Sequence, residues 1–237
     1  MMKDLTVVMP VYNEAECIGE VARSWLDVLG RQGMTFTLLL IDDGSTDRTA
    51  ERLDALSGDA RVRVIHKPNE GHGPTILNAY RMACPDSEWV FQVDSDNEIG
   101  AESFPALWAA REQADAVLGE RRGRVQSAGR RMLSLGSFLL VRLLSGPIPR
   151  DTNVPFRLLR SATLAPLLDR IPADTFAPNV AITGLVLMKG ARLRVVPVQN
   201  RERRTGQTSL VSWKIVRVAG RSLSQVGRIL WRCRRKL

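Results

Sequence analysis

Short apolar segments alternate with amphipathic segments along the first 120 residues of the chain. The apolar runs are 5–9, 36–41, 62–65, 89–93 and 116–118, and they have the length and composition of buried strands. The segments between them predict helices over 14–30, 45–56, 74–83 and 102–113. Strands that alternate with helices form βαβ units, so we expect an α/β fold with a mostly parallel, doubly wound sheet.

Polar clusters follow three of these strands directly. PVYNE (10–14) ends the first strand, DDGSTD (42–47) the second and DSDNE (94–98) the fourth. One such cluster alone would indicate only a loop, because Asp, Asn, Gly and Ser are common loop residues. Doubly wound sheets bind ligands beyond the carboxyl ends of their strands, so three clusters in these positions predict a ligand site at one sheet edge.

The DSDNE cluster has the composition of a cation site. Alternate residues at a strand end point the same way, so we expect Asp94, Asp96 and Glu98 to converge. Three carboxylates repel one another unless a cation lies among them, and oxygen ligands favour Mg²⁺ or Mn²⁺. In the DDGSTD cluster, a carboxylate is suited to the amide edge of a nucleobase, and Gly44 lets the backbone approach closely.

The net charge of +9 is distributed unevenly along the chain. Residues 1–119 contain 10 Lys/Arg and 20 Asp/Glu, whereas residues 201–237 contain 11 and 1. An acidic first half suits a bound cation, and a basic second half suits phosphate groups. A basic nucleic-acid-binding protein is the non-enzyme alternative. The acidic first half and the absence of interleaved basic and aromatic residues argue against it, so we expect no nucleic-acid partner.

The motifs together resemble those of a known family. In order and spacing, PVYNE, DDGSTD and DSDNE resemble the nucleotide-binding half of family 2 glycosyltransferases, which have the GT-A fold. RDTNVPFRLLR (150–160) and VPVQNRERRTGQTSL (196–210) are similar to segments of dolichyl-phosphate mannosyltransferases and their bacterial polyprenyl-phosphate relatives. The resemblance implies an inverting enzyme that uses Mg²⁺ or Mn²⁺. Such an enzyme moves a hexose from GDP-mannose or a UDP-sugar to a polyprenyl or dolichyl phosphate.

The resemblance also assigns roles to single residues. Positions that match contacts to the nucleotide sugar are Pro10, Tyr12, Glu14, Asp43, Asp94 and Arg204. Asp94 and Asp96 match the metal-binding D-x-D pair, and Glu98 stands at a third ligand position where the subgroup has Gln. The catalytic candidates are Asp96, Asp151 and Arg131, with Arg130 and Arg131 in a region where family arginines meet phosphate. Two departures are Val154 in place of Gly and T-S-L (208–210) in place of S-K-L.

The acceptor is indicated by the residues that the second half lacks. A sugar hydroxyl needs a general base, and hydroxyl-directed family members usually have a Glu-Asp pair, whereas IPADTFAPNV (171–180) has only Asp174. A phosphate monoester, with a second pKa of about 6, is already ionised at neutral pH. This difference and the basic segment 120–150 favour a polyprenyl-phosphate acceptor. The alternative is a sugar or lipid hydroxyl acceptor with Asp151 or Asp174 as the base.

Residues 211–236 predict a basic amphipathic helix. Its apolar stripe and its basic face consist of Ile215, Ala219, Leu223, Val226 and Leu230, and of Lys214, Arg217, Arg221, Arg228 and Arg232. Such a helix either lies on an anionic membrane surface or packs its apolar stripe on the catalytic domain, and the two are compatible. The segment 132–144 is apolar nearly all round, so it is either core or a second membrane-touching helix.

These observations define the expected organisation of the chain. We expect a catalytic domain over 1–210 and a basic C-terminal helix over 211–237. No apolar stretch is long enough to span a bilayer, and the N-terminus does not have the pattern of a signal peptide. Three widely spaced cysteines indicate reduced thiols. We therefore expect a cytoplasmic protein, peripheral on the inner face of the membrane. A small membrane-protein partner is left open.

Overall fold

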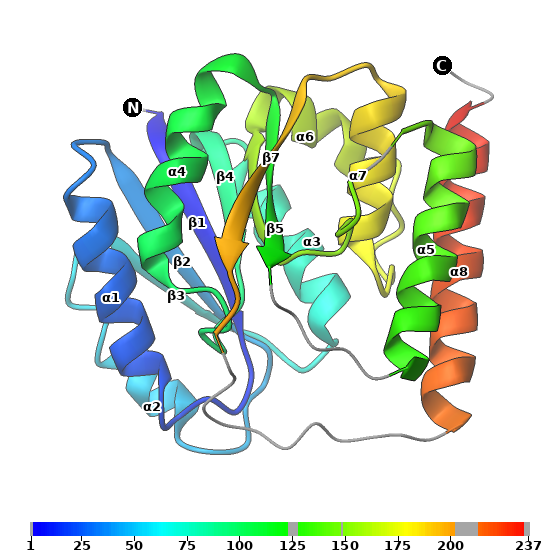
Figure 1. The fold of residues 1–237 in the computed structure, drawn as a ribbon. Helices are drawn as coiled ribbons and strands as arrows, with labels where there is room; N and C mark the ends of the chain where they lie inside the picture. The colour runs from blue at the N-terminus through cyan, green and yellow to red at the C-terminus, as the bar shows by residue number, and fades with distance from the viewer. Residues whose placement is uncertain (1, 123–127, 148, 202–212, 235–237) are drawn as a thin grey trace.

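The computed structural model describes residues 2–122, 128–147, 149–201 and 213–234 (Figure 1). Its strands are β1 (Lys3–Val11), β2 (Phe36–Asp42), β3 (Val62–His66), β4 (Ser87–Val93), β5 (Ala116–Arg122), β6 (Phe156–Arg160) and β7 (Leu193–Gln199). Its α-helices are α1 (Ile18–Gly30), α2 (Thr49–Asp54), α3 (His72–Ala83), α4 (Phe104–Ala110), α5 (Ala128–Ser145), α6 (Ser161–Leu168), α7 (Pro178–Met188) and α8 (Trp213–Arg234). Two short 3₁₀ helices, η1 (Ala101–Ser103) and η2 (Arg111–Gln113), flank α4.

The described strands form one mostly parallel sheet, as the sequence predicts. Their order is β3-β2-β1-β4-β6-β5-β7, and β6 alone runs antiparallel to its neighbours β4 and β5. Because β6 is reversed, its first residue pairs with the last residue of β4, Phe156 with Val93. The loop that leads into β6 therefore reaches the same edge as the carboxyl ends of the parallel strands.

Helices cover both faces of the sheet (Figure 1). Side chains in β4 alternate between the two cores, with Trp89 and Phe91 on the face covered by α1 and α4, and Val90 on the other. On the first face, Trp25 of α1 packs against Phe91 with ring centroids 5.4 Å apart. Trp25, Trp89 and Trp108 are all buried, as expected of core residues. The second face is covered by α3, α6 and α7, with α5 and α8 packed outside α7.

The predicted helix over 45–56 begins later, at Thr49. The sequence offers Ser45 and Thr46 as N-caps, but both residues contact the loop after β1. The Asn13 amide donates to Ser45 Oγ, and the Thr46 amide donates to Asn13 Oδ1. These long-range hydrogen bonds keep the segment after β2 in a loop, so the capping prediction was wrong.

The apolar stripe of α8 is buried against the rest of the protein. Of the predicted stripe, Val226 and Leu230 are at most 2% exposed and Leu223 is half-buried, and the neighbouring Ile229 and Cys233 are at most 6% exposed. In the described part of α8, the stripe therefore packs on the rest of the protein, which is the second of the two arrangements that the sequence left open. Among the residues that the structure describes, no helix is long and apolar enough to cross a membrane.

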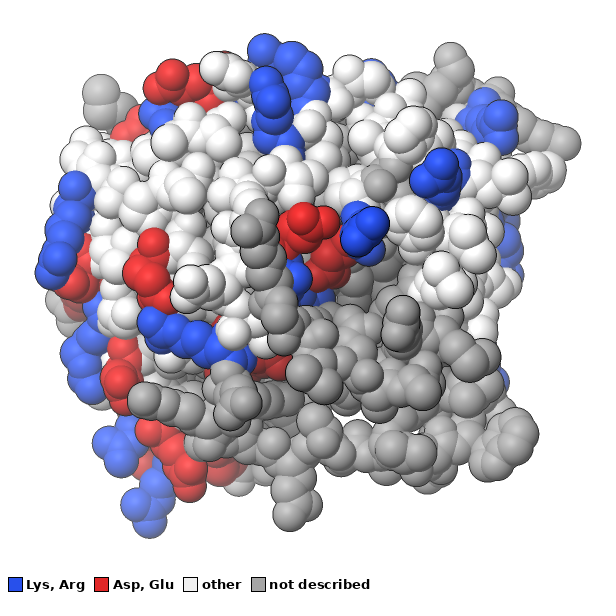
Figure 2. Space-filling model, in the orientation of Figure 1, with Lys and Arg blue, Asp and Glu red and all other residues white. Residues whose placement is uncertain are grey.

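Acidic and basic side chains occupy different parts of the surface. In the view of Figure 2, acidic side chains lie over the left and centre of the molecule. On the right-hand side, where α5 and α8 lie, the residues that are coloured as described are basic or uncharged. The acidic first half and the basic second half of the sequence are therefore also separated in space on this face of the molecule.

The first turn of α3 packs so closely on the loop before α7 that only glycine fits at position 73. A Cβ at Gly73 would lie 2.2 Å from the carbonyl oxygen of Thr175 and 2.7 Å from that of Phe176. We expect Gly73→Ala to lower the free energy of unfolding by about 1–3 kcal/mol, because backbone must shift. The matched control is Gly58→Ala, where a Cβ meets nothing within 4 Å. Urea unfolding measures both variants, and equal midpoints would contradict this close packing.

Candidate functional site

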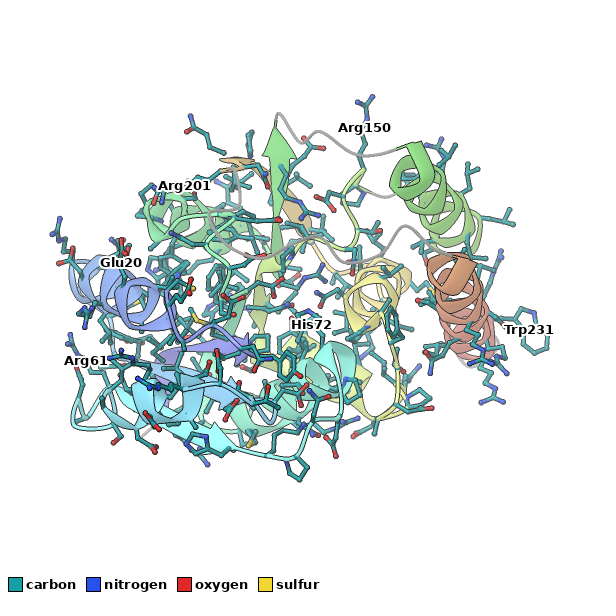
Figure 3. The ribbon with its side chains drawn as sticks, turned by 90° about the horizontal axis from the view of Figure 1, so that it is seen from below. Glu20, Arg61, His72, Arg150, Arg201 and Trp231 are labelled. Atoms are coloured by element: carbon teal, nitrogen blue, oxygen red, sulfur yellow. The ribbon has the colours of Figure 1, made fainter. Side chains whose placement is uncertain are left out.

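The polar clusters after β1 and β2 lie together at the carboxyl edge of the sheet. Val11, the last residue of β1, is level with Asp42, the last residue of β2. Hydrogen bonds between Asn13 and residues 45 and 46 then join the two loops, with donor–acceptor distances of 3.0 and 2.8 Å. Figure 3 looks along the strands at this edge, the lower one in Figure 1. The prediction that these clusters meet is confirmed.

The PVYNE segment divides into a buried part and an exposed part. Pro10 is buried inside β1, whereas Tyr12 is 47% exposed just beyond the strand end. The Glu14 amide donates to Thr49 Oγ1 at 2.8 Å, and its carboxylate accepts a hydrogen bond from the Cys17 thiol. Tyr12 is therefore the member of this group that offers an open surface to a ligand.

Asp43 is a structural anchor for the loop before α3. Its side chain is 7% exposed, and both carboxylate oxygens accept hydrogen bonds. The donors are the amides of Glu70 and Gly71, at 3.0 and 2.9 Å, and Lys67 Nζ at 2.5 Å. Burial alone would raise the pKa of the Asp43 carboxyl, but the bonds from Lys67 and the Glu70 amide hold that pKa below its usual value.

Gly44 also serves the protein's own loops. Its φ is 69°, and a Cβ there would lie 2.7 Å from the backbone nitrogen of Asn69. The sequence predicts that Asp43 offers a carboxylate to a nucleobase and that Gly44 lets a ligand approach. In the structure, both residues instead bring the loop 67–71 against the loop after β2. A contact between Asp43 and a base stays a prediction.

The DSDNE cluster does not form the three-carboxylate group that the sequence predicts. The strand ends at Val93, and the following turn contains Asn97 at a φ of 55°, so alternation of side chains stops before the cluster. Asp96 Oδ1 accepts the Glu98 amide at 3.1 Å, within the turn. Among the described residues, no three His, Cys, Asp or Glu side chains gather as a metal-binding group. The convergence of Asp94, Asp96 and Glu98 is therefore not seen among the described residues, and metal binding by these side chains stays a prediction.

Asp94 nevertheless has the environment of a cation ligand. Its Oδ1 is buried and has no hydrogen-bond partner among the described residues, and His72 Nε2 lies 3.8 Å from it. Burial raises the pKa of Asp94 to about 6, while the charge of His72 opposes this and that of Asp96 adds to it. A buried carboxylate oxygen without a partner is unusual. It fits Mg²⁺ or Mn²⁺, which take one or two carboxylates and complete their coordination with phosphate and water.

Arg121, at the end of β5, joins three parts of this edge. Its side chain is 5% exposed and donates to both oxygens of Asp151, from Nε at 2.7 Å and from Nη2 at 3.1 Å. Its Nη1 also lies 3.7 Å from Glu98 Oε2. Glu98 and Asp151 thus balance a buried cation, so Glu98 does not fit a metal ligand in this arrangement.

Sequence reasoning missed Arg121 because it ended the fifth strand at residue 118. The strand continues to Arg122, and this placement puts Arg121 at the edge with the other polar residues. The sequence did contain a signal for Arg121. It follows the apolar run 116–118 closely, just as the polar clusters follow the other predicted strands.

Arg157 fixes the loop that carries Asp151. Its side chain is fully buried, and its guanidinium donates to the carbonyl oxygens of Val154, Thr152 and Asn179 at 2.9, 3.0 and 2.9 Å. These bonds tie the segment before β6 to the start of α7. Val154, where the family pattern has Gly, is itself fully buried.

Several predicted site residues cannot be placed. Arg130 and Arg131 belong to α5, but their side chains lie outside the described part of the structure. Arg204 and the T-S-L segment lie within 202–212, also outside the described residues. Their roles at phosphate groups stay predictions.

The fold is that of a doubly wound α/β protein, a class whose members bind ligands beyond the carboxyl ends of their strands. The chain belongs to glycosyl transferase family 2, whose family model matches residues 6–168. The expected family membership is confirmed.

Two curated relatives share a printed name, undecaprenyl-phosphate 4-deoxy-4-formamido-L-arabinose transferase. The relative from Edwardsiella ictaluri is 28% identical over 90% of this chain and 64% of its own length. The relative from Pseudomonas aeruginosa is 33% identical over 75% of this chain and 53% of its own length. The chain thus spans less than two thirds of the curated relatives it matches.

Solved structures confirm the GT-A fold. Glucosyl-3-phosphoglycerate synthase from Mycobacterium tuberculosis, solved with Mn²⁺, UDP-glucose and phosphoglyceric acid, superposes with a TM-score of 0.65. It shares 18% sequence identity, and the match covers 96% of this chain and 80% of that chain. S. aureus TarS 1–349 superposes with a TM-score of 0.56 at 22% identity, over 81% and 58% of the two chains.

His66 couples the end of β3 to two carboxylates. Nδ1 lies 2.9 Å from Asp42 Oδ2, and Nε2 lies 3.0 Å from Asp54 Oδ1. Hydrogen bonds to Asp42 and Asp54 raise the pKa of His66. A raised pKa stabilises the fold fully below the unfolded value of about 6.5, and this stabilisation is lost as pH rises through the folded value.

We therefore expect His66→Gln to reduce the free energy of unfolding more at about pH 5.5 than at about pH 8.5. The imidazole is 40% exposed, so solvent screening keeps the difference below about 1 kcal/mol. Urea unfolding at the two pH values measures it. Asp54→Asn added to His66→Gln should bring no further pH dependence in this range. A larger loss at the higher pH would refute the ion-pair account.

Proposed function

We propose that this protein transfers a sugar from a nucleoside diphosphate sugar to the phosphate group of a polyprenyl lipid. Support comes from membership of glycosyl transferase family 2 and from relatives whose names specify undecaprenyl phosphate. Those relatives are named for a pentose derivative, so we leave open whether the sugar is the hexose expected from the sequence. The donor base, guanine or uracil, is also left open.

The observation that carries the proposal is the buried Oδ1 of Asp94 at the carboxyl edge of the sheet, which has no hydrogen-bond partner among the residues that the structure describes. The Asp94 side chain is 26% exposed with one buried oxygen, and a carboxylate of this kind near a second carboxylate, Asp96, is suited to Mg²⁺ or Mn²⁺ bound together with a diphosphate. A solved neighbour contains Mn²⁺ with UDP-glucose, which supports this donor class for the present chain. When bound, the ion would neutralise the negative charge that develops on the diphosphate leaving group.

The site residues have distinct roles in this proposal. Tyr12 flanks the nucleoside with its exposed ring, and Asp43 orders the loop beneath it. Asp94 and Asp96 would hold the ion. Arg121 positions the loop of Asp151 beside them. Arg131 and Arg204 supply positive charge to phosphate groups, as the family resemblance implies.

The environments of the two candidate general bases, Asp151 and Asp174, support a phosphate acceptor. Both oxygens of Asp151 accept hydrogen bonds from the buried Arg121, so this carboxylate is already committed to a cation. The other candidate, Asp174, is exposed on the loop before α7. A lipid phosphate is ionised without a base and needs only to be positioned in line with the sugar. We place the reaction at the inner face of the membrane, as the sequence leads us to expect.

Donor binding tests the role of Asp96. We expect UDP or GDP, or the matching sugar nucleotide, to raise the melting temperature only when Mg²⁺ or Mn²⁺ is present. Ligand at about 100 times its Kd stabilises by about 2.7 kcal/mol. Asp96→Ala should abolish the metal-dependent increase, whereas the matched variant Glu98→Gln should keep it, because Glu98 faces Arg121. A metal-dependent shift that survives in Asp96→Ala would refute the ion site.

Acceptor chemistry is tested at Asp174. For a phosphate acceptor, we expect Asp174→Asn to transfer sugar to a polyprenyl phosphate at a rate within about twofold of the wild type, since no proton must be removed. The exposed Asp169→Asn serves as the matched control. Loss of a general base typically costs about 10²–10⁴-fold in rate. A decrease of that size in Asp174→Asn alone would favour the hydroxyl alternative.

A further inference from the structure

The outer face of α5 carries a stripe of exposed leucines. Leu135, Leu139 and Leu143 are 55%, 55% and 76% exposed. They recur every four residues, so they lie along one side of the helix. The opposite side of α5 is the packed one, with Val141 fully buried. Single exposed leucines are common on protein surfaces, but an aligned row of three marks an interaction surface.

Helix α8 lies beside this stripe and extends it. A Cβ at Gly136 would lie 3.6 Å from Leu223, and one at Gly227 would lie 3.5 Å from Leu140. Both pairs have the same offset in sequence, so α5 and α8 run parallel in one register, as Figure 1 shows. In this register Leu143 is level with Leu230, which directly precedes Trp231, and the side chain of Trp231 is 50% exposed (Figure 3).

The exposed side of α8 is basic. Arg221, Arg228 and Arg232 are exposed, and their spacing of seven and four residues places them on one side of the helix. Neither α5 nor α8 contains an acidic residue. Figure 2 accordingly shows no acidic side chain on the right-hand side of the molecule. We name the leucine stripe, Trp231 and these arginines together the α5–α8 face.

We propose that the α5–α8 face docks on an anionic lipid bilayer. The leucines and Trp231 enter the boundary between head groups and acyl chains, and the arginines contact lipid phosphates. The inference rests on the proposed lipid acceptor. The sequence analysis assigned the membrane contact to the apolar stripe of the C-terminal helix. That stripe packs against the protein, so in this proposal the exposed leucines of α5 make the apolar contact with lipid.

Charge favours a bilayer over a second copy of this chain. In a twofold-symmetric dimer the same patch meets itself, so three arginines of one copy would face those of the other without acidic partners. Like charges brought together in this way repel. An anionic surface has the complementary charge, and an aromatic side chain at the border of an apolar stripe is typical of interfacial contacts.

The position of the face also suits the site. Helix α5 begins at Ala128, shortly after Arg122 ends β5 at the ligand-binding edge. In Figure 1 the first turns of α5 and α8 lie toward that lower edge. Docking through these helices therefore holds the edge with Asp94 and Arg121 close to a lipid head group.

Vesicle binding of the full chain tests the proposal. Binding is measured by co-sedimentation with phosphatidylcholine vesicles, with and without phosphatidylglycerol. The two test variants are Leu135→Gln/Leu139→Gln/Leu143→Gln and Arg221→Gln/Arg228→Gln/Arg232→Gln. The matched controls are Arg23→Gln/Arg31→Gln/Arg61→Gln, which removes the same charge near α1, and Val195→Gln, which removes an exposed apolar side chain on β7.

We expect the wild type to bind only vesicles that contain phosphatidylglycerol, and less tightly at high salt. Each test variant should weaken the partition coefficient by at least about tenfold, and the controls should stay within about twofold. Thermal melting checks the fold. If the leucine variant is unfolded, the arginine variant decides alone, because its side chains are exposed and do not belong to the core.

Vesicle binding that is unchanged in both folded test variants would overturn the proposal. So would a leucine variant that alters only the oligomeric state in gel filtration. Transfer to a water-soluble, short-chain polyprenyl phosphate without vesicles is measured in parallel and should be the same in all variants. Its absence in the wild type would count against the proposed function and leave the docking result intact.

Discussion

The bidentate ion pair between Arg121 and Asp151 holds the candidate site together. A guanidinium that is 5% exposed needs its charge balanced, and the balancing carboxylates come from two other loops, those after β4 and before β6. These loops meet only because β6 runs antiparallel between β4 and β5. Arg157 then ties the loop before β6 to α7 through backbone carbonyls. Two buried cations thus hold in place the edge at which one oxygen of Asp94 has no hydrogen-bond partner within the described part of the chain.

The sequence predicted the sheet and the meeting of the loops after β1 and β2 well, because buried parallel strands are apolar runs and polar residues follow them. It failed where partners are remote in sequence. Ser45 and Thr46 are residue types that often cap helices, but here both form hydrogen bonds with Asn13 in the loop after β1. Glu98 was expected beside Asp94 and Asp96, yet the turn after β4 directs it toward Arg121. The alternation of side chains is a property of strands, and it ends where β4 ends.

The C-terminal helix shows a further limit of local patterns. A helical wheel identifies an apolar stripe and a basic face, but it does not identify what covers the stripe. In the structure, α5 and α7 cover it, with glycines at the closest contacts, such as Gly184 beside Leu230. Exposed apolar surface is found instead on α5, whose sequence is apolar nearly all round and therefore gives little directional signal. Packing of the two helices decides which leucines remain exposed.

The central claim is that a lipid phosphate, and no hydroxyl, accepts the sugar. The most direct measurement is transfer of radiolabel from a panel of UDP- and GDP-sugars, with Mg²⁺ or Mn²⁺, to undecaprenyl phosphate and, in parallel, to undecaprenol. The account predicts lipid-extractable label with the phosphate only, in a product from which mild acid releases the sugar. Label on undecaprenol at a comparable rate, or an acid-stable product, would contradict it.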